Sequence, residues 1–431
     1  MQTHRIRISP EVALTCVKTD KFKTGCLSIN LVTGLRRDTA ALTALLPRVL
    51  RRGSAKLPDM ELISAALDEL YGARVEPIVR KKGELQCVGI FADFPDDRFI
   101  PGAQDILEKT AALAGEILLC PDLHDGLLRA DYVESEKSNL IDDIRAGIND
   151  KRGYSIDRLL EQMCAGEAFG VNRFGDEENA LKITPETLTA HYHRLIADSR
   201  VEVFYCGSAE VDRVKAALAS VFEKLPPRVG ITAPKTEVIL HPAEGAPRRF
   251  TEELDVSQGK LSVGFRLGSA MENPNYPALI VFNAVYGGSV TSKLFMNVRE
   301  KLALCYYASS ILEKHKGIML VASGVEFSKF DVALDEILLQ LNHVKTGEVS
   351  EWELESSKRS VTTAIKSAMD RQSGLEDLYF DSSIAAVSYD PDELCALVEA
   401  VTLQEVVEIA AGVETDSIYL LVGKGGDNHG A

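Results

Sequence analysis

Apolar and polar residues recur in the same order in the two halves of the chain, and this recurrence predicts the organisation of the protein. Residues 25–34 and 259–268 each form an apolar run closed by a glycine, which indicates a β-strand followed by a turn. The two runs lie 234 positions apart and share two glycines, a leucine and a serine in register. One matching decapeptide can arise by chance, so the segments that follow each strand decide whether this is a repeat.

A helical pattern follows the strand in both halves. Residues 38–52 and 275–286 carry apolar side chains at three- and four-residue spacing, and each run ends at glycine, which is typical of a helix buried against a sheet. A second helix comes next in each half, and then an apolar strand that ends in an acidic residue and phenylalanine. The predicted ranges are 59–70 and 86–94 in the first half, and 292–301 and 319–327 in the second.

This ordered series at a nearly constant offset predicts an α+β fold with two homologous lobes. Each lobe should hold a mostly antiparallel sheet with helices packed on it, and the lobes should face each other as a clamshell. We place the N-terminal lobe at 1–227, a linker at 228–249 and the C-terminal lobe at 250–431. Five prolines between positions 226 and 249, together with little helical periodicity, mark the join.

Length and charge narrow the range of partners. The chain has 431 residues, enough for two or more domains, and a formal net charge of −16. An acidic surface repels phosphate backbones, so we expect no nucleic-acid partner. A basic or neutral peptide would be attracted, although acidity also serves solubility alone. No stretch reaches about 18 consecutive apolar residues, so we expect no membrane span.

The N-terminal sequence and the cysteines favour a cytoplasmic location. The first residues lack the apolar run and the small-residue cleavage site of a secretory signal. The eight cysteines are scattered singly, without a Cys-x-x-Cys pair. In a chain of this size they indicate buried thiols in a reducing cytoplasm.

Residues 286–307 carry the strongest local motif. They read Tyr-Gly-Gly-Ser-Val-Thr-Ser-Lys-Leu-Phe-Met-Asn-Val-Arg-Glu-Lys-Leu-Ala-Leu-Cys-Tyr-Tyr. This block closely resembles the C-terminal lobe of pitrilysin/insulinase-type zinc peptidases, in which a Gly-Gly-Ser turn precedes Ser-Arg/Lys-Leu-Phe, Arg-Glu-Lys and Leu-x-Tyr. The resemblance implies that Arg299 and Tyr306 contact a bound peptide. An arginine fork can hold a peptide carbonyl or carboxylate, and a phenol can donate to an oxyanion. The alternative is an Arg–Glu surface pair with Tyr306 packed in the core.

The same resemblance implies a His-x-x-Glu-His zinc motif on the first apolar helix of the N-terminal lobe, and this chain lacks it. The aligned residues read Ala-Leu-Leu-Pro-Arg, so Ala44 and Arg48 stand at the histidine positions and Pro47 stands at the glutamate position. Alanine has no lone pair for zinc, and arginine is a permanent cation. Glu134 matches the family's third ligand, but one carboxylate cannot hold catalytic zinc. We therefore expect no metal and no cofactor, with Glu134 either solvated or paired with Arg48.

The sequence shows no other set of residues with the spacing of a metal site or a catalytic nucleophile. His191 and His193 are the only close histidine pair, and residues two apart on a helix point to different faces. A Gly-x-Ser-x-Gly nucleophile elbow is also absent from the sequence. A zinc endopeptidase with unorthodox ligands is therefore the weakest of three hypotheses.

The leading hypothesis is a non-catalytic, cytoplasmic subunit of this family. It would bind peptide, or complete the chamber of an active His-x-x-Glu-His zinc peptidase in a heterodimer. The second hypothesis is a structural scaffold or a homodimer without a peptide role.

Overall fold

The computed structural model describes residues 1–102, 104–226 and 234–424, which form two compact units. Unit 1 comprises the described parts of Met1–Arg145, Val171–Lys235 and Met369–Ile384. Unit 2 comprises those of Ala146–Gly170, Thr236–Ala368 and Ala385–Ala431. Each unit therefore takes one short segment from the other half of the sequence. The predicted linker at 228–249 stays a prediction, and its residues 228–233 lie outside the described residues.

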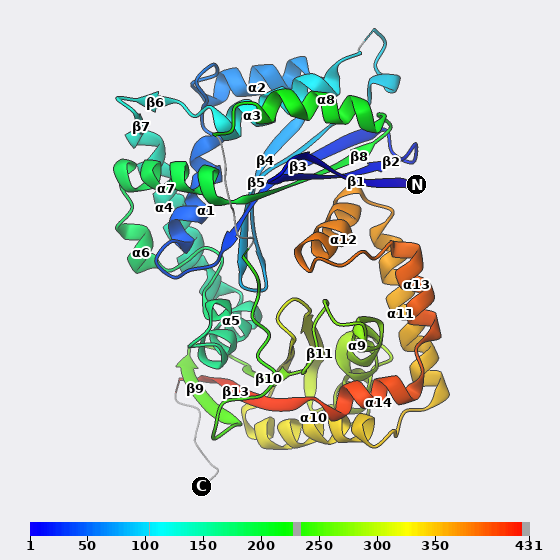
Figure 1. The fold of residues 1–431 in the computed structure, drawn as a ribbon. Helices are drawn as coiled ribbons and strands as arrows, with labels where there is room; N and C mark the ends of the chain where they lie inside the picture. The colour runs from blue at the N-terminus through cyan, green and yellow to red at the C-terminus, as the bar shows by residue number, and fades with distance from the viewer. Residues whose placement is uncertain (103, 227–233, 425–431) are drawn as a thin grey trace. The chain divides into compact units, whose positions relative to one another are not determined.

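Unit 1 is built on a six-stranded sheet with the order β1-β2-β8-β3-β5-β4 (Figure 1). All neighbours pair antiparallel except β2 and β8, which run parallel. The sheet requires a glycine at position 89, because a Cβ there would lie 1.9 Å from the carbonyl oxygen of Ile29. The strands are β1 Gln2–Ser9, β2 Val12–Lys18, β3 Thr24–Gly34, β4 Arg74–Lys82, β5 Leu85–Pro95 and β8 Arg200–Gly207. A separate small hairpin joins β6 Leu123–His124 and β7 Leu127–Leu128.

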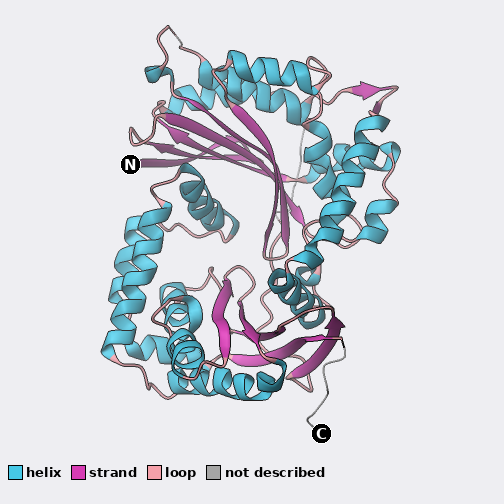
Figure 2. Ribbon diagram, turned by 180° about the vertical axis from the view of Figure 1, so that it is seen from behind, coloured by secondary structure: helices cyan, strands magenta, loops and turns pink. Residues whose placement is uncertain are grey.

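Helices cover both faces of this sheet (Figures 1 and 2). Alternate residues of β3 divide between the two faces: Ile29 joins the main core, whereas Cys26 packs with Leu375 and Tyr379 of α12. Burial on both sides explains why β3 reads as a continuous apolar run rather than an alternating one. The helices of unit 1 are α1 Ala40–Leu50, α2 Met60–Glu69, α3 Ile106–Leu119, α4 Ala130–Ala146, α6 Glu177–Leu181, α7 Pro185–Asp198, α8 Val211–Phe222 and α12 Gln372–Ile384.

Unit 2 repeats this plan with a five-stranded sheet of order β11-β12-β10-β13-β9. Its neighbours pair antiparallel except β13 and β9, which run parallel. The strands are β9 Arg248–Leu254, β10 Gly259–Arg266, β11 Cys305–Glu313, β12 Ile318–Val325 and β13 Glu414–Gly423. The helices are α5 Lys151–Met163, α9 Tyr276–Asn283, α10 Phe330–Lys345, α11 Glu351–Ala368, α13 Pro391–Ala400 and α14 Leu403–Ala411. The predicted α+β class with two sheet-and-helix lobes is therefore confirmed.

Short helical segments complete both units. Two of them, at the positions of the 286–307 motif, are π-helices: Ala284–Gly288 (η4) and Leu294–Lys301 (η5). The sequence predicted ordinary helices there, because side-chain spacing does not reveal which backbone ladder forms. The 3₁₀ turns are Asp97–Phe99 (η1), Gly147–Asn149 (η2), Ala168–Gly170 (η3) and Phe327–Lys329 (η6).

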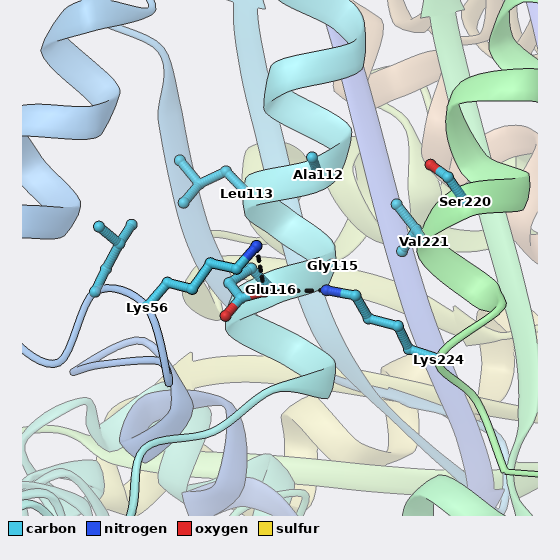
Figure 3. A pocket seen from close by; sticks show the side chains of 9 residues that line it. Lys56, Ala112, Leu113, Gly115, Glu116, Ser220, Val221 and Lys224 are labelled. Carbon is cyan, nitrogen blue, oxygen red and sulfur yellow. Dashed lines mark hydrogen bonds and ion pairs between the residues drawn. The ribbon is translucent and has the colours of Figure 1, made fainter.

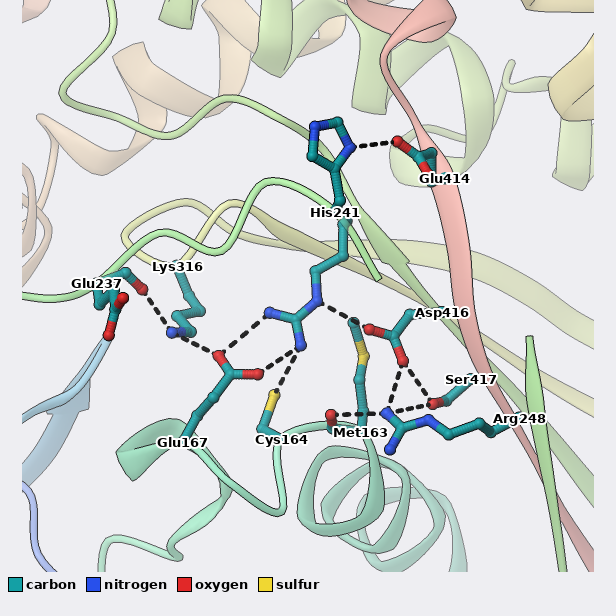
Figure 4. Close-up of polar contacts among 11 residues, drawn as sticks. Met163, Cys164, Glu167, Glu237, His241, Arg248, Lys316, Glu414, Asp416 and Ser417 are labelled. Carbon is teal, nitrogen blue, oxygen red and sulfur yellow. Dashed lines mark hydrogen bonds and ion pairs between the residues drawn. The ribbon is translucent and has the colours of Figure 1, made fainter. Parts of the chain in front are cut away.

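A buried ionic network fastens the segment at 146–170 to the sheet of unit 2 (Figure 4). Arg266 of β10 donates to Glu167 at 2.5 Å and to Asp416 of β13 at 2.9 Å. Lys316 pairs with the same Glu167 at 2.6 Å, and Arg248 pairs with Asp416 at 2.9 Å. Burial raises the pKa of Glu167, but hydrogen bonds from Arg266 and Lys316 outweigh it and hold that pKa below its usual range.

The cysteines and helices bear on the remaining sequence predictions. Every cysteine except the half-buried Cys120 is buried, as their apolar surroundings predicted. No helix within the described ranges is long and apolar enough to cross a bilayer.

Candidate functional site

Helix α1 occupies the place where the family's zinc motif would lie. The side chains of Ala44 and Pro47 are buried in the core of unit 1, so neither presents a donor atom. Pro47 lies inside the helix, where it cannot donate the backbone hydrogen bond that Thr43 O would otherwise receive. The helix therefore keeps the motif's position without its chemistry.

Arg48 is held by its own ion pair. Its guanidinium Nη1 lies 2.7 Å from Asp143 Oδ2 on α4, and its Cζ stands 5.6 Å from the centroid of the Phe174 ring. The predicted pair between Arg48 and Glu134 is wrong, because Glu134 instead bonds Lys137 at 2.7 Å. Glu134 lies two and a half helical turns before Asp143, so the two carboxylates leave α4 on opposite sides.

A second arginine–carboxylate pair lies beside the first and was missed by sequence reasoning. Arg52 Nη1 is 2.7 Å from Glu136 Oε1, and its Cζ lies 5.0 Å from the Tyr132 ring centroid. Glu136 and Asp143 are seven residues apart, the same helical spacing that joins the buried Val133 and Leu140. That spacing was the available signal, since residues seven apart share a face.

A cavity of about 570 Å³ opens at the C-terminal end of α1, within unit 1. Three arginines line it: Arg48 of α1, and Arg51 and Arg52, which come directly after the last residue of that helix. Its carboxylates are Glu76 of the edge strand β4 and Glu136 of α4. Arg48, at one of the expected zinc-motif positions, is therefore part of the cavity lining.

Histidines near α1 do not restore a metal site. His191 Nε2 is hydrogen-bonded to Thr43 Oγ1 at 2.8 Å. Burial lowers the pKa of His191 to about 4; the nearby Arg194 adds to this effect and Asp38 opposes it. Across the described ranges, no three His, Cys, Asp or Glu side chains gather so that they could hold a metal ion.

A smaller cavity of about 360 Å³ lies between α3 and α8 of unit 1 (Figure 3). The helices approach closely because Gly115 faces Val221, and a Cβ at Gly115 would lie only 2.4 Å from that valine. The one carboxylate in the lining, Glu116, is paired with Lys224 at 3.0 Å and approached by Lys56 at 3.9 Å. The only carboxylate in the lining is therefore engaged by two lysines, which leaves it unavailable as a base.

The two predicted peptide-contacting residues lie on neighbouring elements of unit 2. Arg299 is on η5, which packs against β11, the strand that carries Tyr306. The connecting turn passes through Ala303 with φ of 49°, a left-handed conformation that favours glycine. π-Helices and strained turns of this kind occur often at functional sites.

Both side chains remain accessible. Arg299 is 42% exposed, contacts Glu300 at 3.4 Å and stacks on Phe295 at 4.7 Å. Tyr306 is 66% exposed and is the extra residue of a β-bulge between Cys305 and Tyr307. The bulge turns Tyr306 out of the ladder. The alternative of a core tyrosine is therefore wrong, whereas its Arg–Glu surface pair is present.

Two units built on a repeated strand–helix plan, with a motif helix that lacks every metal ligand, define an inactive homologue of two-lobed zinc peptidases. Residues 182–361 match the family model described as the peptidase M16 inactive domain. The chain is also 32% identical over 411 residues to the probable inactive metalloprotease YmfF of Bacillus subtilis strain 168, an alignment that covers 95% of each. The chain belongs to the peptidase M16 family, the pitrilysin-type family, as an inactive member.

Solved structures share this fold over almost the whole chain. A conserved protein from Enterococcus faecalis V583 superposes with a TM-score of 0.87 at 27% identity, covering 99% of this chain and 100% of that one. A chain of complex III2 from Candida albicans gives a TM-score of 0.75 at 16% identity, covering 98% and 96%. The second likeness concerns the fold alone.

Proposed function

We propose that this chain is a non-catalytic M16-family subunit that binds peptide or completes the chamber of an active His-x-x-Glu-His zinc peptidase. The observation that carries the proposal is an asymmetry between the units. In unit 1, Ala44, Pro47 and Arg48 have removed the metal-binding chemistry. In unit 2, Arg299 and Tyr306 remain exposed on a π-helix and a bulge.

The exposure of Tyr306 supports a role outside the core. A tyrosine whose ring is mostly solvated contributes little packing energy, and a bulge that turns it outward weakens the local ladder. A partner or a peptide that binds at this surface would contact the exposed Tyr306 ring. The likeness to a chain of complex III2 adds that this fold is found within a larger assembly.

The test is co-purification followed by an activity measurement. The tagged chain is isolated from its native host, and any M16 homologue with an intact motif that co-purifies is assayed for peptide cleavage with and without it. We expect Arg299→Ala and Tyr306→Phe to lower cleavage by the complex several-fold. Arg359→Ala, an exposed arginine of α11, is the matched control and should leave cleavage unchanged.

The competing function is a structural scaffold or a homodimer without a peptide role. A scaffold would tolerate Arg299→Ala and Tyr306→Phe as well as it tolerates Arg359→Ala. A solitary monomer that shows no association with any homologue would also defeat the proposal. A cytoplasmic location is part of the proposal and is supported by the eight cysteines, which are scattered singly and mostly buried.

A further inference from the structure

We propose that the arginine-lined cavity at the end of α1 binds the carboxylate of an acidic side chain in a peptide. The inference deepens the proposed function, because it names a peptide class, and it rests on the peptide-binding part of that function. The cavity belongs wholly to unit 1, so the isolated chain contains the complete site.

The three arginines are aligned by the helix. Arg48, Arg51 and Arg52 stand at positions i, i+3 and i+4, which lie on one face of an α-helix. Arg51 and Arg52 come directly after the last residue of α1, Leu50, where the chain is still turning. Three guanidinium groups consequently converge on one cavity.

Not all three arginines are paired with a carboxylate by a hydrogen bond within the described parts of the chain. Arg48 and Arg52 each have one carboxylate partner. Arg51 donates Nε to the carbonyl of Val75 at 2.6 Å and Nη1 to Met60 Sδ at 3.2 Å, both uncharged acceptors. In addition, Arg52 Nε is buried and has no hydrogen-bond partner among the described residues. Buried donors without partners are rare, so the Arg52 guanidinium is not fully satisfied within the protein.

The charge of the lining differs from the charge of the whole chain. Three arginines face the two lining carboxylates, Glu76 and Glu136, and Asp143 pairs with Arg48 beside them, so the site is close to neutral, whereas the complete chain carries −16. At physiological ionic strength exposed charges are screened beyond about 8 Å, so a ligand inside the cavity responds mainly to the groups that line it. Arg51 is the group that attracts an anion here, because its hydrogen bonds go to uncharged acceptors, although the distant field disfavours an anion.

The rest of the lining identifies the anion as one attached to carbon. Met60, Pro77, Val79 and Phe174 supply apolar surface next to the guanidiniums. A peptide residue offers methylene or backbone atoms to such a surface, whereas inorganic phosphate offers none. Planar carboxylates also match the arginine fork in bidentate geometry.

The experiment measures binding of two fluorescein-labelled nonapeptide mixtures to the purified full chain by fluorescence anisotropy. The mixtures are identical except for a fixed central glutamate or glutamine. We expect the glutamate mixture to bind at least about tenfold more tightly, because hydrogen bonds to a charged group discriminate by that order. Equal binding, or tighter binding of the glutamine mixture as the net charge predicts, would overturn the proposal.

Variants locate the preference. Arg51→Met should reduce the glutamate preference to within about twofold while glutamine binding stays unchanged. Arg51→Lys, which keeps the charge but loses the fork, should retain part of the preference and guards against a folding defect. The control is Arg74→Met, an exposed arginine on β4 paired with Asp93 at 3.1 Å, which should not change the preference. A preference that survives Arg51→Met and Arg48→Met overturns the assignment to this cavity.

Two further outcomes separate this proposal from its alternatives. Displacement by inorganic phosphate without any glutamate preference would show a general anion site and overturn the peptide assignment. The binding assay uses no partner, so its failure is distinguishable from failure of the subunit role. If Arg299 and Tyr306 variants weaken a co-purified peptidase while the glutamate preference is absent, only the cavity proposal falls.

Discussion

Units 1 and 2 each contain an arginine–carboxylate cluster, and the two clusters differ in their access to water. In unit 2, Arg266 is 2% exposed and Asp416 is fully buried. In unit 1, the side chains of Arg48 and Arg52 keep 19% and 32% of their surface in solvent beside a cavity. The ion-pair distances are similar in both, from 2.5 to 2.9 Å.

Burial, rather than pairing distance, therefore separates a structural cluster from one that can receive a ligand. A buried charge that loses its partner pays the full cost of desolvation, so each member of the unit 2 network is tied to the others. A half-exposed arginine can exchange water or a ligand for one of its contacts at small cost. The comparison predicts a graded series of mutational effects.

The largest effect is expected at Arg266 of unit 2. Arg266→Met removes the group that bridges Glu167 and Asp416, which leaves buried carboxylates undercompensated. We expect a loss of about 3–5 kcal/mol in the free energy of unfolding. Urea denaturation followed by circular dichroism measures the loss, and hydrogen exchange of β10 amides shows that it arises in unit 2.

Arg249→Met is the matched control for this variant. Arg249 lies on the exposed face of β9 and contacts the exposed Asp331 only at 3.7 Å. It should cost less than about 1 kcal/mol. If Arg266→Met proved as mild as this control, burial would not be what distinguishes the two clusters.

The next largest effect is a pH dependence that belongs to unit 1. Folding holds the pKa of His191 at about 4, below the ordinary 6.5, so the unfolded chain takes up the proton first. Stability is therefore complete above about pH 6.5 and falls as the pH drops towards 4, by about 2–3 kcal/mol. Urea midpoints measured from pH 7.5 to pH 4.5 should show this loss.

His191→Gln isolates the contribution of this one group. Glutamine cannot be protonated in this range and can still bond Thr43, so the variant should lose less stability on acidification than the native chain. His4→Gln, at an exposed position, should follow the native curve. Parallel curves for the native chain and His191→Gln would show that protonation of His191 does not cause the loss of stability at low pH.

The repeat made the two sheets predictable from the sequence, because glycine-closed apolar runs identify strands regardless of their partners. The strands predicted at 25–34 and 259–268 are β3 and β10, at the centre of each sheet. Helix α7 also has local signals at its start, because the Thr184 side chain caps it and a proline stands at its first position. Local signals were sufficient where local chemistry decides the structure.

Long-range choices were not predictable in the same way. The amphipathic pattern of α5 shows that this helix must bury a face, but no local pattern shows that α5 and α12 each pack in the unit formed by the other half of the chain. The partner of Arg48 was also not predictable from local pattern. Glu134 matches the family's third metal ligand and was therefore the expected partner, whereas Asp143, on the opposite side of α4, is the partner in the structure. The arginine-lined cavity likewise depends on the meeting of α1, α2, β4 and α4.

A smaller effect is expected at Arg48 of unit 1. Arg48→Ala loses one half-exposed ion pair and a contact with Phe174, which together should cost about 1 kcal/mol. A double-mutant cycle with Asp143→Ala should give a coupling of about 0.5–1 kcal/mol. The exposed Arg36–Asp38 pair, treated in the same way, serves as the reference. A coupling as large as the stability loss expected for Arg266→Met would mean that the cluster of unit 1 is structural, like that of unit 2.

The smallest effect is expected at Glu134, the residue at the third-ligand position. Its side chain is 57% exposed and pairs only along α4 with Lys137, so Glu134→Gln should change the unfolding free energy by less than about 0.5 kcal/mol. A cycle between Glu134→Gln and Arg48→Ala should show no coupling, because Arg48 is held by Asp143 instead. Measurable coupling would mean that Glu134 turns towards α1 in solution, and the position would then retain part of its ancestral link to the motif helix. If no coupling is measured, Glu134 plays no part in the arginine-lined cavity at the end of α1.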